Sequence, residues 1–203
     1  SFTPNQVPYA VGITSYFITN AVWHGYGAFQ QYFDAKHQSG IKTWAAVWKL
    51  HTNDKLTYWD ILPNVVRNQI LIFLPAVFIQ AKLFGARGVR IDGGTSLSVP
   101  SILLEIVGLY LIYEIGFYYG HLCMHHPRLY STYHKLHHSA QASVGISGQY
   151  ATLPDFFCMQ CGPVIAGSLI INSHVFSVML FSIIGSLNSI HSHGAYNWPG
   201  FPR

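Results

Sequence analysis

The stretch from residue 99 to residue 138 reads VPSILLEIVGLYLIYEIGFYYGHLCMHHPRLYSTYHKLHH, and it decides the class of fold. It begins with an apolar run of about 20 residues, which is the length that crosses the hydrocarbon core of a bilayer as a helix. Directly after Gly120 the run becomes a segment rich in histidine. The sequence therefore predicts a membrane-spanning helix that leads into a cluster of candidate metal ligands.

The composition of the whole chain also indicates a membrane protein. Half of the 203 residues are hydrophobic and only 9% are charged, whereas about a quarter of the residues in a soluble domain are charged. Eleven Lys and Arg against seven Asp and Glu give a net charge of +4. Because the basic residues are scattered, as is usual for charges that flank a membrane, we expect lipids rather than a nucleic acid as partners. The three cysteines make no disulfide framework.

Apolar stretches predict the architecture. They cover residues 7–29, 64–84, 99–120 and 156–190, and the last is long enough for a hairpin of two short helices around residues 172–174. The polar segment between the first two, residues 30–59, interleaves Lys with Trp and is expected to be a loop on the membrane surface. The predicted fold is an all-α integral membrane bundle of four to five transmembrane helices with a histidine-rich helical cap.

Domain organisation and orientation follow from the same pattern. The chain is expected to be a single membrane domain over residues 1–203, with N-terminal helices and the interfacial loop in residues 1–98. Most Lys and Arg residues lie on the side of the membrane that carries the histidines. Since basic residues gather on the cytosolic side, the histidine-rich cap is predicted to be cytosolic.

Nine of the twelve histidines lie between positions 121 and 193, and eight of these nine form three groups. Residues three and four apart share one face of a helix, so the histidines within each of the first two groups face a common point. Pro127 ends the first helix near His126, and the chain can then fold back to bring the two groups together. Imidazole suits iron, copper, zinc and nickel, and the histidines outnumber the four ligands of one tetrahedral zinc, which favours two metal ions. The candidate ligands are His121, His125, His126, His134, His137, His138, His191 and His193.

Two acidic residues interrupt the 99–120 span. Glu114 lies two helical turns before His121, so we expect its carboxylate to accept the second ring N–H of a ligand histidine. The alternative for Glu114 is a hydrogen bond to neighbouring tyrosines. Glu105 has no evident partner in the sequence, so a buried carboxyl and a proton relay are both open.

The motif Glu114-x-x-Phe117-Tyr118-Tyr119-x-His121-x-x-x-His125-His126-Pro127, with Leu129-Tyr130 and His134-Lys135-x-His137-His138, resembles the fatty acid hydroxylase and sterol desaturase superfamily. This superfamily includes C-4 methylsterol oxidases. The resemblance continues through Tyr150-Ala151, Gly162-Pro163 and His193-Gly194-Ala195-Tyr196-Asn197-Trp198-Pro199, and so covers residues 99–203. It implies a membrane enzyme of lipid metabolism, an oxidoreductase with two iron ions. The implied reaction is O2-dependent hydroxylation or desaturation of a lipid or sterol C–H bond. Cytochrome b5 or a reductase would supply electrons, and the endoplasmic reticulum is the implied membrane.

The chain departs from the family pattern at three places. Leu122 stands where the family usually has Arg, and Thr152 stands in the place of a histidine. A third His-x-x-His-His box is expected after Trp198-Pro199, beyond Arg203. Two alternatives follow: the native chain continues and completes a di-iron enzyme, or the protein is a degenerate member. A degenerate member would be a non-catalytic scaffold subunit in a larger complex, with one zinc or no metal, for example in the mitochondrial inner membrane.

Overall fold

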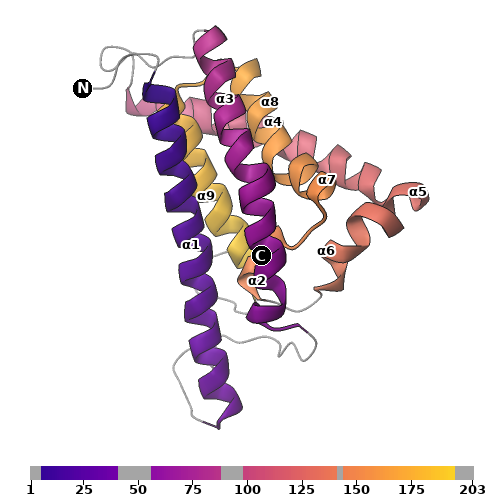
Figure 1. Ribbon diagram of the computed structural model, residues 1–203. Coiled ribbons are helices and arrows are strands. Elements are labelled where there is room, and N and C mark those ends of the chain that lie inside the picture. The colour runs from indigo at the N-terminus through magenta and orange to yellow at the C-terminus, as the bar shows by residue number, and fades with distance from the viewer. Residues whose placement is uncertain (1–5, 41–55, 88–97, 141–143, 195–203) are drawn as a thin grey trace.

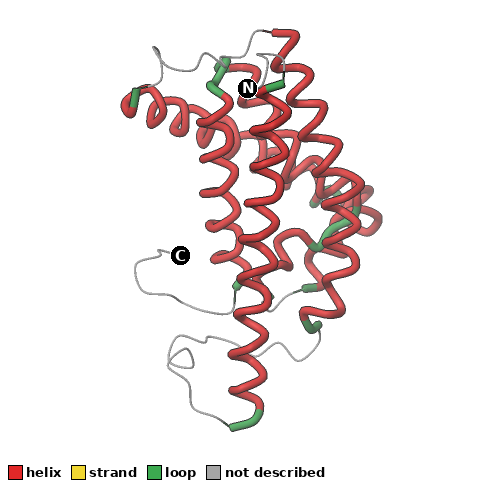
Figure 2. Tube along the Cα trace, turned by 60° about the vertical axis from the view of Figure 1, so that its left-hand side comes forward, coloured by secondary structure: helices red, strands yellow, loops and turns green. Residues whose placement is uncertain are grey.

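The computed structural model describes residues 6–40, 56–87, 98–140 and 144–194, and every regular element within these ranges is helical (Figures 1 and 2). The α-helices are α1 (Val7–Gln38), α2 (Tyr58–Asn68), α3 (Leu74–Arg87), α4 (Val99–Met124), α5 (Pro127–Leu129), α6 (Lys135–Ser139), α7 (Leu153–Phe156), α8 (Gly162–Ile170) and α9 (Val175–His193). Short π-helical turns continue α2 into α3, α5 into α6 and α7 into α8: η2 (Gln69–Phe73), η3 (Tyr130–His134) and η5 (Phe157–Cys161). One 3-10 turn, η4 (Gly145–Gln149), precedes α7.

Four helical segments in the described ranges are long and apolar enough to cross a membrane. They are Tyr58–Leu83, Val99–Met124, Leu153–Ile170 and Val175–His193. This finding confirms the predicted all-α membrane bundle. The predicted hairpin is also confirmed, because α8 and α9 follow each other around a turn in which Asn172 has a left-handed φ of +48°. Asparagine tolerates that conformation better than most residues.

The N-terminal part differs from the prediction. The apolar stretch of residues 7–29 is helical, but the helix that contains it, α1, is not among the four segments that could cross a membrane. The loop expected from residue 30 begins later, because α1 continues to Gln38. Residues 30–38 contain no glycine or proline, so nothing in the local sequence stops the helix there. Residues 41–55 of the predicted surface loop lie outside the described residues, and the loop ends slightly earlier than predicted, because α2 begins at Tyr58.

The helices form a bundle with the histidine-bearing helices at its edge. In Figure 1, α1, α3 and α9 stand side by side, and α4 runs behind them toward α5 and α6. Buried apolar side chains from α4 and α9, including Leu109, Val178 and Phe181, form one core cluster. A second cluster, with Trp23, Ile61 and Ile146 at its centre, joins α1, α2 and η4. The bundle therefore holds the buried η4 turn against α1, α2 and α9.

Glu105 ties two of these elements together. Its carboxylate accepts a hydrogen bond of 2.9 Å from the backbone N–H of His174, in the turn between α8 and α9. His174 in turn caps α9, since its ring nitrogen Nδ1 accepts from the N–H of Phe176. Glu105 therefore has a structural partner that the sequence did not reveal.

Candidate metal centre

The end of α4 and the turn after it bring the first two histidine groups together. His121 lies in the last turn of α4 and His125 caps its C-terminus. Pro127 then begins the short α5, and the chain turns back through η3 into α6, which places His134 and His138 beside the end of α4. This reversal is the one predicted from Pro127.

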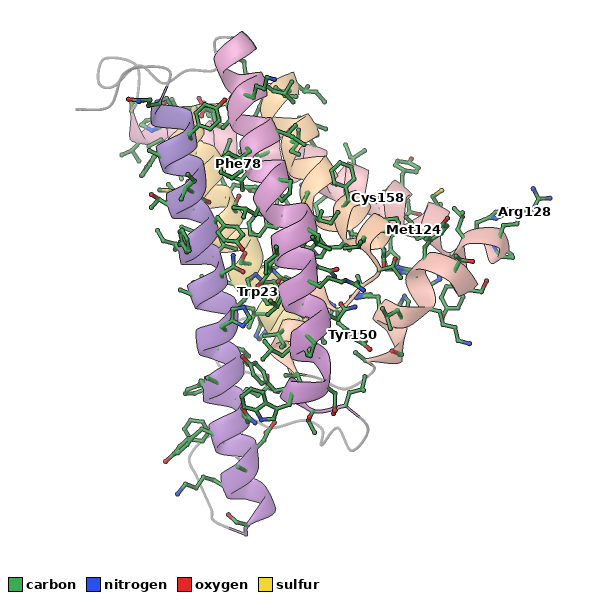
Figure 3. The ribbon with its side chains drawn as sticks, viewed as in Figure 1. Trp23, Phe78, Met124, Arg128, Tyr150 and Cys158 are labelled. Carbon is green, nitrogen blue, oxygen red and sulfur yellow. The ribbon has the colours of Figure 1, made fainter. Side chains whose placement is uncertain are left out.

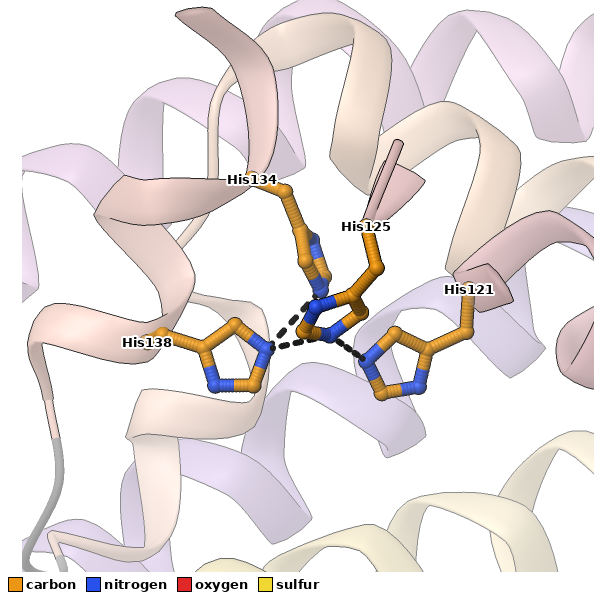
Figure 4. Close-up of side chains that lie close together, drawn as sticks. All are labelled: His121, His125, His134 and His138. Carbon is orange, nitrogen blue, oxygen red and sulfur yellow. Dashed lines mark hydrogen bonds between the residues drawn. The ribbon is translucent and has the colours of Figure 1, made fainter. Parts of the chain in front are cut away.

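Four imidazoles converge on one point (Figure 4). The Nε2 atoms of His121 and His125 lie 3.0 Å apart, those of His125 and His138 lie 3.1 Å apart, and those of His138 and His134 lie 3.0 Å apart. One potential ligand atom from each of the four residues lies within 4.8 Å of all the others. We call these four residues the histidine cluster.

The geometry of the histidine cluster fits a transition-metal ion. Two imidazole nitrogens that bind one ion at about 2.1 Å lie about 3.0 Å apart when they subtend a right angle. A neutral imidazole nitrogen carries either a proton or a lone pair, so one nitrogen cannot both donate and accept. His138 Nε2 and His125 Nε2 each contact two other imidazole nitrogens. A cation at the common point would satisfy all four lone pairs together.

Asp155 fixes the orientation of one ligand. The Nδ1–H of His134 donates to Asp155 Oδ2 over 2.9 Å, and both side chains are almost completely buried. With the proton held at Nδ1, the Nε2 lone pair of His134 points to the cluster. A carboxylate in this position is the usual partner of a metal-binding histidine. Thr152, the residue in place of the family's histidine, donates its hydroxyl to the carbonyl of Tyr133 next to His134.

A second pair of histidines lies beside the cluster. The ring centroids of His137 and His193 are 5.4 Å apart, and His137 is 5.5 Å from His134 by the same measure. The Nδ1–H of His137 donates to the carbonyl of Tyr150, and that of His193 donates to the carbonyl of Ser189. Both rings therefore keep an Nε2 lone pair for a ligand.

Besides His137 and His193, three residues predicted from the sequence lie outside the histidine cluster. His126 is exposed and caps α5, where its Nδ1 accepts from the N–H of Arg128. His191 is buried on α9 and is not one of the four converging residues. Glu114 lines a cavity that histidines of the cluster also line, and no hydrogen bond joins it to a histidine within the described residues. The carboxylate that contacts a cluster histidine belongs to Asp155.

Three histidines lie outside the segments that could span the membrane. Burial favours the neutral form of their rings, which is the form that binds metals. The pKa of His134 is lowered by burial and by nearby His125. Burial, with the nearby His193, lowers the pKa of His137 to about 3. Burial also lowers the pKa of His138, and the neighbouring His134 and His125 lower it further. These rings are therefore neutral at physiological pH and offer lone pairs.

A large cavity leads to the histidines. It has a volume of about 940 Å³ and is lined by apolar side chains from α1, α3, α4, α8 and α9. His121, His134, His137, His138 and His193 line this cavity together with Asp155. Pockets of this size and composition bind small molecules or lipid chains. The site therefore combines a metal-binding cluster with room for an apolar ligand.

Asp155 is the functional residue that sequence reasoning missed. It is an isolated acidic residue between the second histidine group and a long apolar run. Because ligand histidines commonly donate their second N–H to a carboxylate, this isolated charge was a usable signal. Glu114 was preferred because its helical spacing from His121 can be read from the sequence. The contact between Asp155 and His134 cannot, because the two residues are 21 positions apart and meet only in the folded chain.

Comparison with known proteins points to the family that the histidine motifs resemble. Residues 106–202 match the fatty acid hydroxylase family. A fatty acid hydroxylase of Mycosarcoma maydis, ahd1, is 27% identical over 164 residues, which are 79% of this chain and 43% of that protein. Human fatty acid hydroxylase domain-containing protein 2 is 35% identical over 100 residues, 49% of this chain and 30% of that protein.

A third relative has a sterol-related name. The methylsterol monooxygenase erg25B of Aspergillus fumigatus is 23% identical over 151 residues, 70% of this chain and 49% of that protein. The chain thus spans less than half the length of these three relatives. No solved structure matches it. Residues 106–202 nevertheless contain the histidine cluster and Asp155 together. Residues 106–202 of the chain therefore belong to the fatty acid hydroxylase family.

Proposed function

We propose that this chain is the membrane part of an O2-dependent oxidase that hydroxylates or desaturates a C–H bond of a lipid or sterol. The observation that carries this proposal is the meeting of four imidazole Nε2 atoms at the end of a cavity of about 940 Å³. A metal-binding cluster alone would suit many proteins. A cluster that opens onto a long apolar cavity suits the oxidation of a hydrocarbon substrate.

Two iron ions are the proposed cofactors. The histidine cluster would hold one ion, and His137 and His193 would contribute to a second. Imidazole nitrogens are suitable ligands for iron. Bound iron supplies the O2 activation and C–H oxidation that no side chain supplies.

The protein's own residues have three tasks in this proposal. Asp155 holds His134 in the tautomer that presents Nε2. Tyr150 does the same for His137 through its backbone carbonyl. The apolar walls, such as Phe117, Phe156 and Val178, hold the substrate and exclude water from a reactive oxidant.

An electron donor would approach from the histidine side. Arg128, at the tip of α5, points away from the bundle (Figure 3), and Lys135 on α6 is also exposed. Positive side chains next to the site suit an acidic donor such as cytochrome b5 or a reductase. The endoplasmic reticulum is the proposed membrane, as the family resemblance implies.

The test compares two histidines that the sequence treats alike and the structure separates. His138→Gln removes a member of the cluster, and His126→Gln changes an exposed histidine outside it. The full-length protein is expressed in a yeast strain, and lipid oxidation and bound iron are measured in its membranes. We expect His138→Gln to abolish turnover and iron binding, and His126→Gln to retain both. Equal loss in both variants, or full activity of His138→Gln, would contradict the proposed site.

A further inference from the structure

The cavity has a polar stripe on α1, outside the residues that match the family. Ser15, Thr19 and Trp23 follow one another at intervals of four residues, so they lie on one face of the helix. All three are buried and line the cavity. This stripe faces the same space as the histidines.

Two groups in the stripe have no hydrogen-bond partner within the described residues. They are the hydroxyl of Thr19 and the indole N–H of Trp23, on side chains that are only 3% and 1% exposed. Buried polar groups are nearly always hydrogen-bonded, because leaving a donor unsatisfied costs free energy. Cavity-lining hydroxyls on α9 behave normally: Ser182 and Ser186 donate to carbonyls of their own helix.

Trp23 lies at the histidine end of the cavity. A Cβ atom built on Gly148 would be 3.0 Å from the ring carbon Cη2 of Trp23 and 3.1 Å from His193 Nδ1. The indole and the imidazole therefore flank the same glycine. Thr19, one turn along α1, is on the adjacent part of the wall.

The chemistry of these donors defines their ligand. The indole N–H only donates and a hydroxyl donates or accepts, so the ligand must offer an oxygen that accepts. Neither Lys nor Arg is among the described residues that line the cavity, whereas Glu114 and Asp155 are. No Lys or Arg side chain would pair there with an anionic group, which favours a neutral oxygen at Thr19 and Trp23.

We propose that Thr19 and Trp23 bind a hydroxyl or carbonyl oxygen of the lipid in the cavity and thereby select an oxygenated lipid over a plain hydrocarbon. This inference rests on the proposed function for the identity of the occupant as a lipid. It adds a recognition site on α1 to the oxidation site formed by α4, η3 and α6.

The experiment measures binding, so that it does not depend on turnover. The full-length protein is placed in lipid nanodiscs with bound tritiated 1-octadecanol, which unlabelled 1-octadecanol or octadecane then displaces. Displacement from nanodiscs without protein corrects for partitioning. We expect a preference for the alcohol of about tenfold, the effect of one or two buried hydrogen bonds.

Variants assign the preference to its residues. Thr19→Val removes the hydroxyl with little change of shape, and Trp23→Phe removes the N–H. Each is expected to reduce the preference several-fold. Thr19→Ser keeps a hydroxyl and should retain it. Ser186→Ala is the matched control, because that cavity-lining hydroxyl is already bonded within α9.

The outcomes separate this inference from the proposed function. Equal affinity for alcohol and hydrocarbon in the unmodified protein would overturn the inference, as would an undiminished preference in Thr19→Val. Trp23 packs in the core, so the Thr19 variants keep the test decisive if Trp23→Phe does not fold. Iron content and turnover are measured on the same preparation. Their absence would refute the proposed function and leave the binding result standing.

Discussion

Replacing Asp155 by asparagine tests how the site orients its ligands. The buried carboxylate accepts the Nδ1–H of His134 over 2.9 Å. Asparagine has nearly the same shape and can still accept this bond, but it is uncharged. A hydrogen bond to a charged group contributes about 1.5–3 kcal/mol and a neutral one about 0.5–1.5 kcal/mol. The difference of about 1–1.5 kcal/mol corresponds to roughly tenfold weaker metal binding.

A second cost adds to this loss. Asp155 Oδ1 is buried and has no hydrogen-bond partner among the residues that the structure describes. In Asp155→Asn the amide NH2 would take that position and remain an unsatisfied donor. We therefore expect metal affinity to fall between about tenfold and a hundredfold, which is the range known for partners of metal-binding histidines.

The assay is competition for the metal between the purified protein and a chelator, with the metal measured by mass spectrometry. Glu114→Gln is the control, because Glu114 lines the same cavity without bonding to a histidine in the described part of the chain. We expect it to bind metal as the unmodified protein does. If Glu114→Gln weakened metal binding and Asp155→Asn did not, the assignment of Asp155 would be refuted.

Three further predictions concern the framework of the site. Asn68 is buried and donates to the carbonyls of Gln149 and Ala151, on either side of the carbonyl that holds His137. Asn68→Leu should therefore lower the free energy of unfolding by about 2 kcal/mol. Denaturation in micelles measures this value, and an unchanged value would contradict the role of Asn68. Gly148→Ala places a Cβ 2.7 Å from Ser189 Oγ and 3.1 Å from His193 Nδ1, so the metal affinity should fall. Gly25 has open space around its Cα, so Gly25→Ala should leave the metal affinity unchanged. Equal effects of the two substitutions would contradict the prediction. In the metal-free folded protein the pKa of His137 is lowered to about 3. Below about pH 6.5 the unfolded state therefore binds more protons than the folded state. The free energy of unfolding should then fall with acidification between about pH 6.5 and 3, by up to about 1.4 kcal/mol per pH unit. Thermal unfolding across this range, compared with His137→Gln, checks the sign, and a flat profile would contradict it.

The sequence predicted the parts of the fold that depend on local pattern. Apolar length identified the four segments that could cross a membrane, but it also selected residues 7–29, which are not one of them. Pro127 correctly predicted the reversal that brings His134 to His125. Helical spacing predicted that His121 and His125 converge, as do His134 and His138. It did not distinguish His126 from its neighbours, because the helix ends there and the backbone of His126 leaves the helical conformation.

The remaining features depend on contacts between distant segments. Asp155 reaches His134 across 21 residues of the chain, and Asn68 bonds to Gln149 across 81 residues. Thr19 and Trp23 line the cavity only because α1 packs against α3 and α9. No spacing rule encodes such approaches, because each requires the packed bundle.

The metal content of the full-length protein, purified from its own membrane without chelators, tests the central claim most directly. Elemental analysis of this protein should find about two irons per chain, as expected for six or more oriented imidazoles. His138→Gln should contain less iron, and His126→Gln should match the unmodified protein. A single zinc or no metal in the unmodified protein would contradict the account and would indicate a structural rather than a catalytic role.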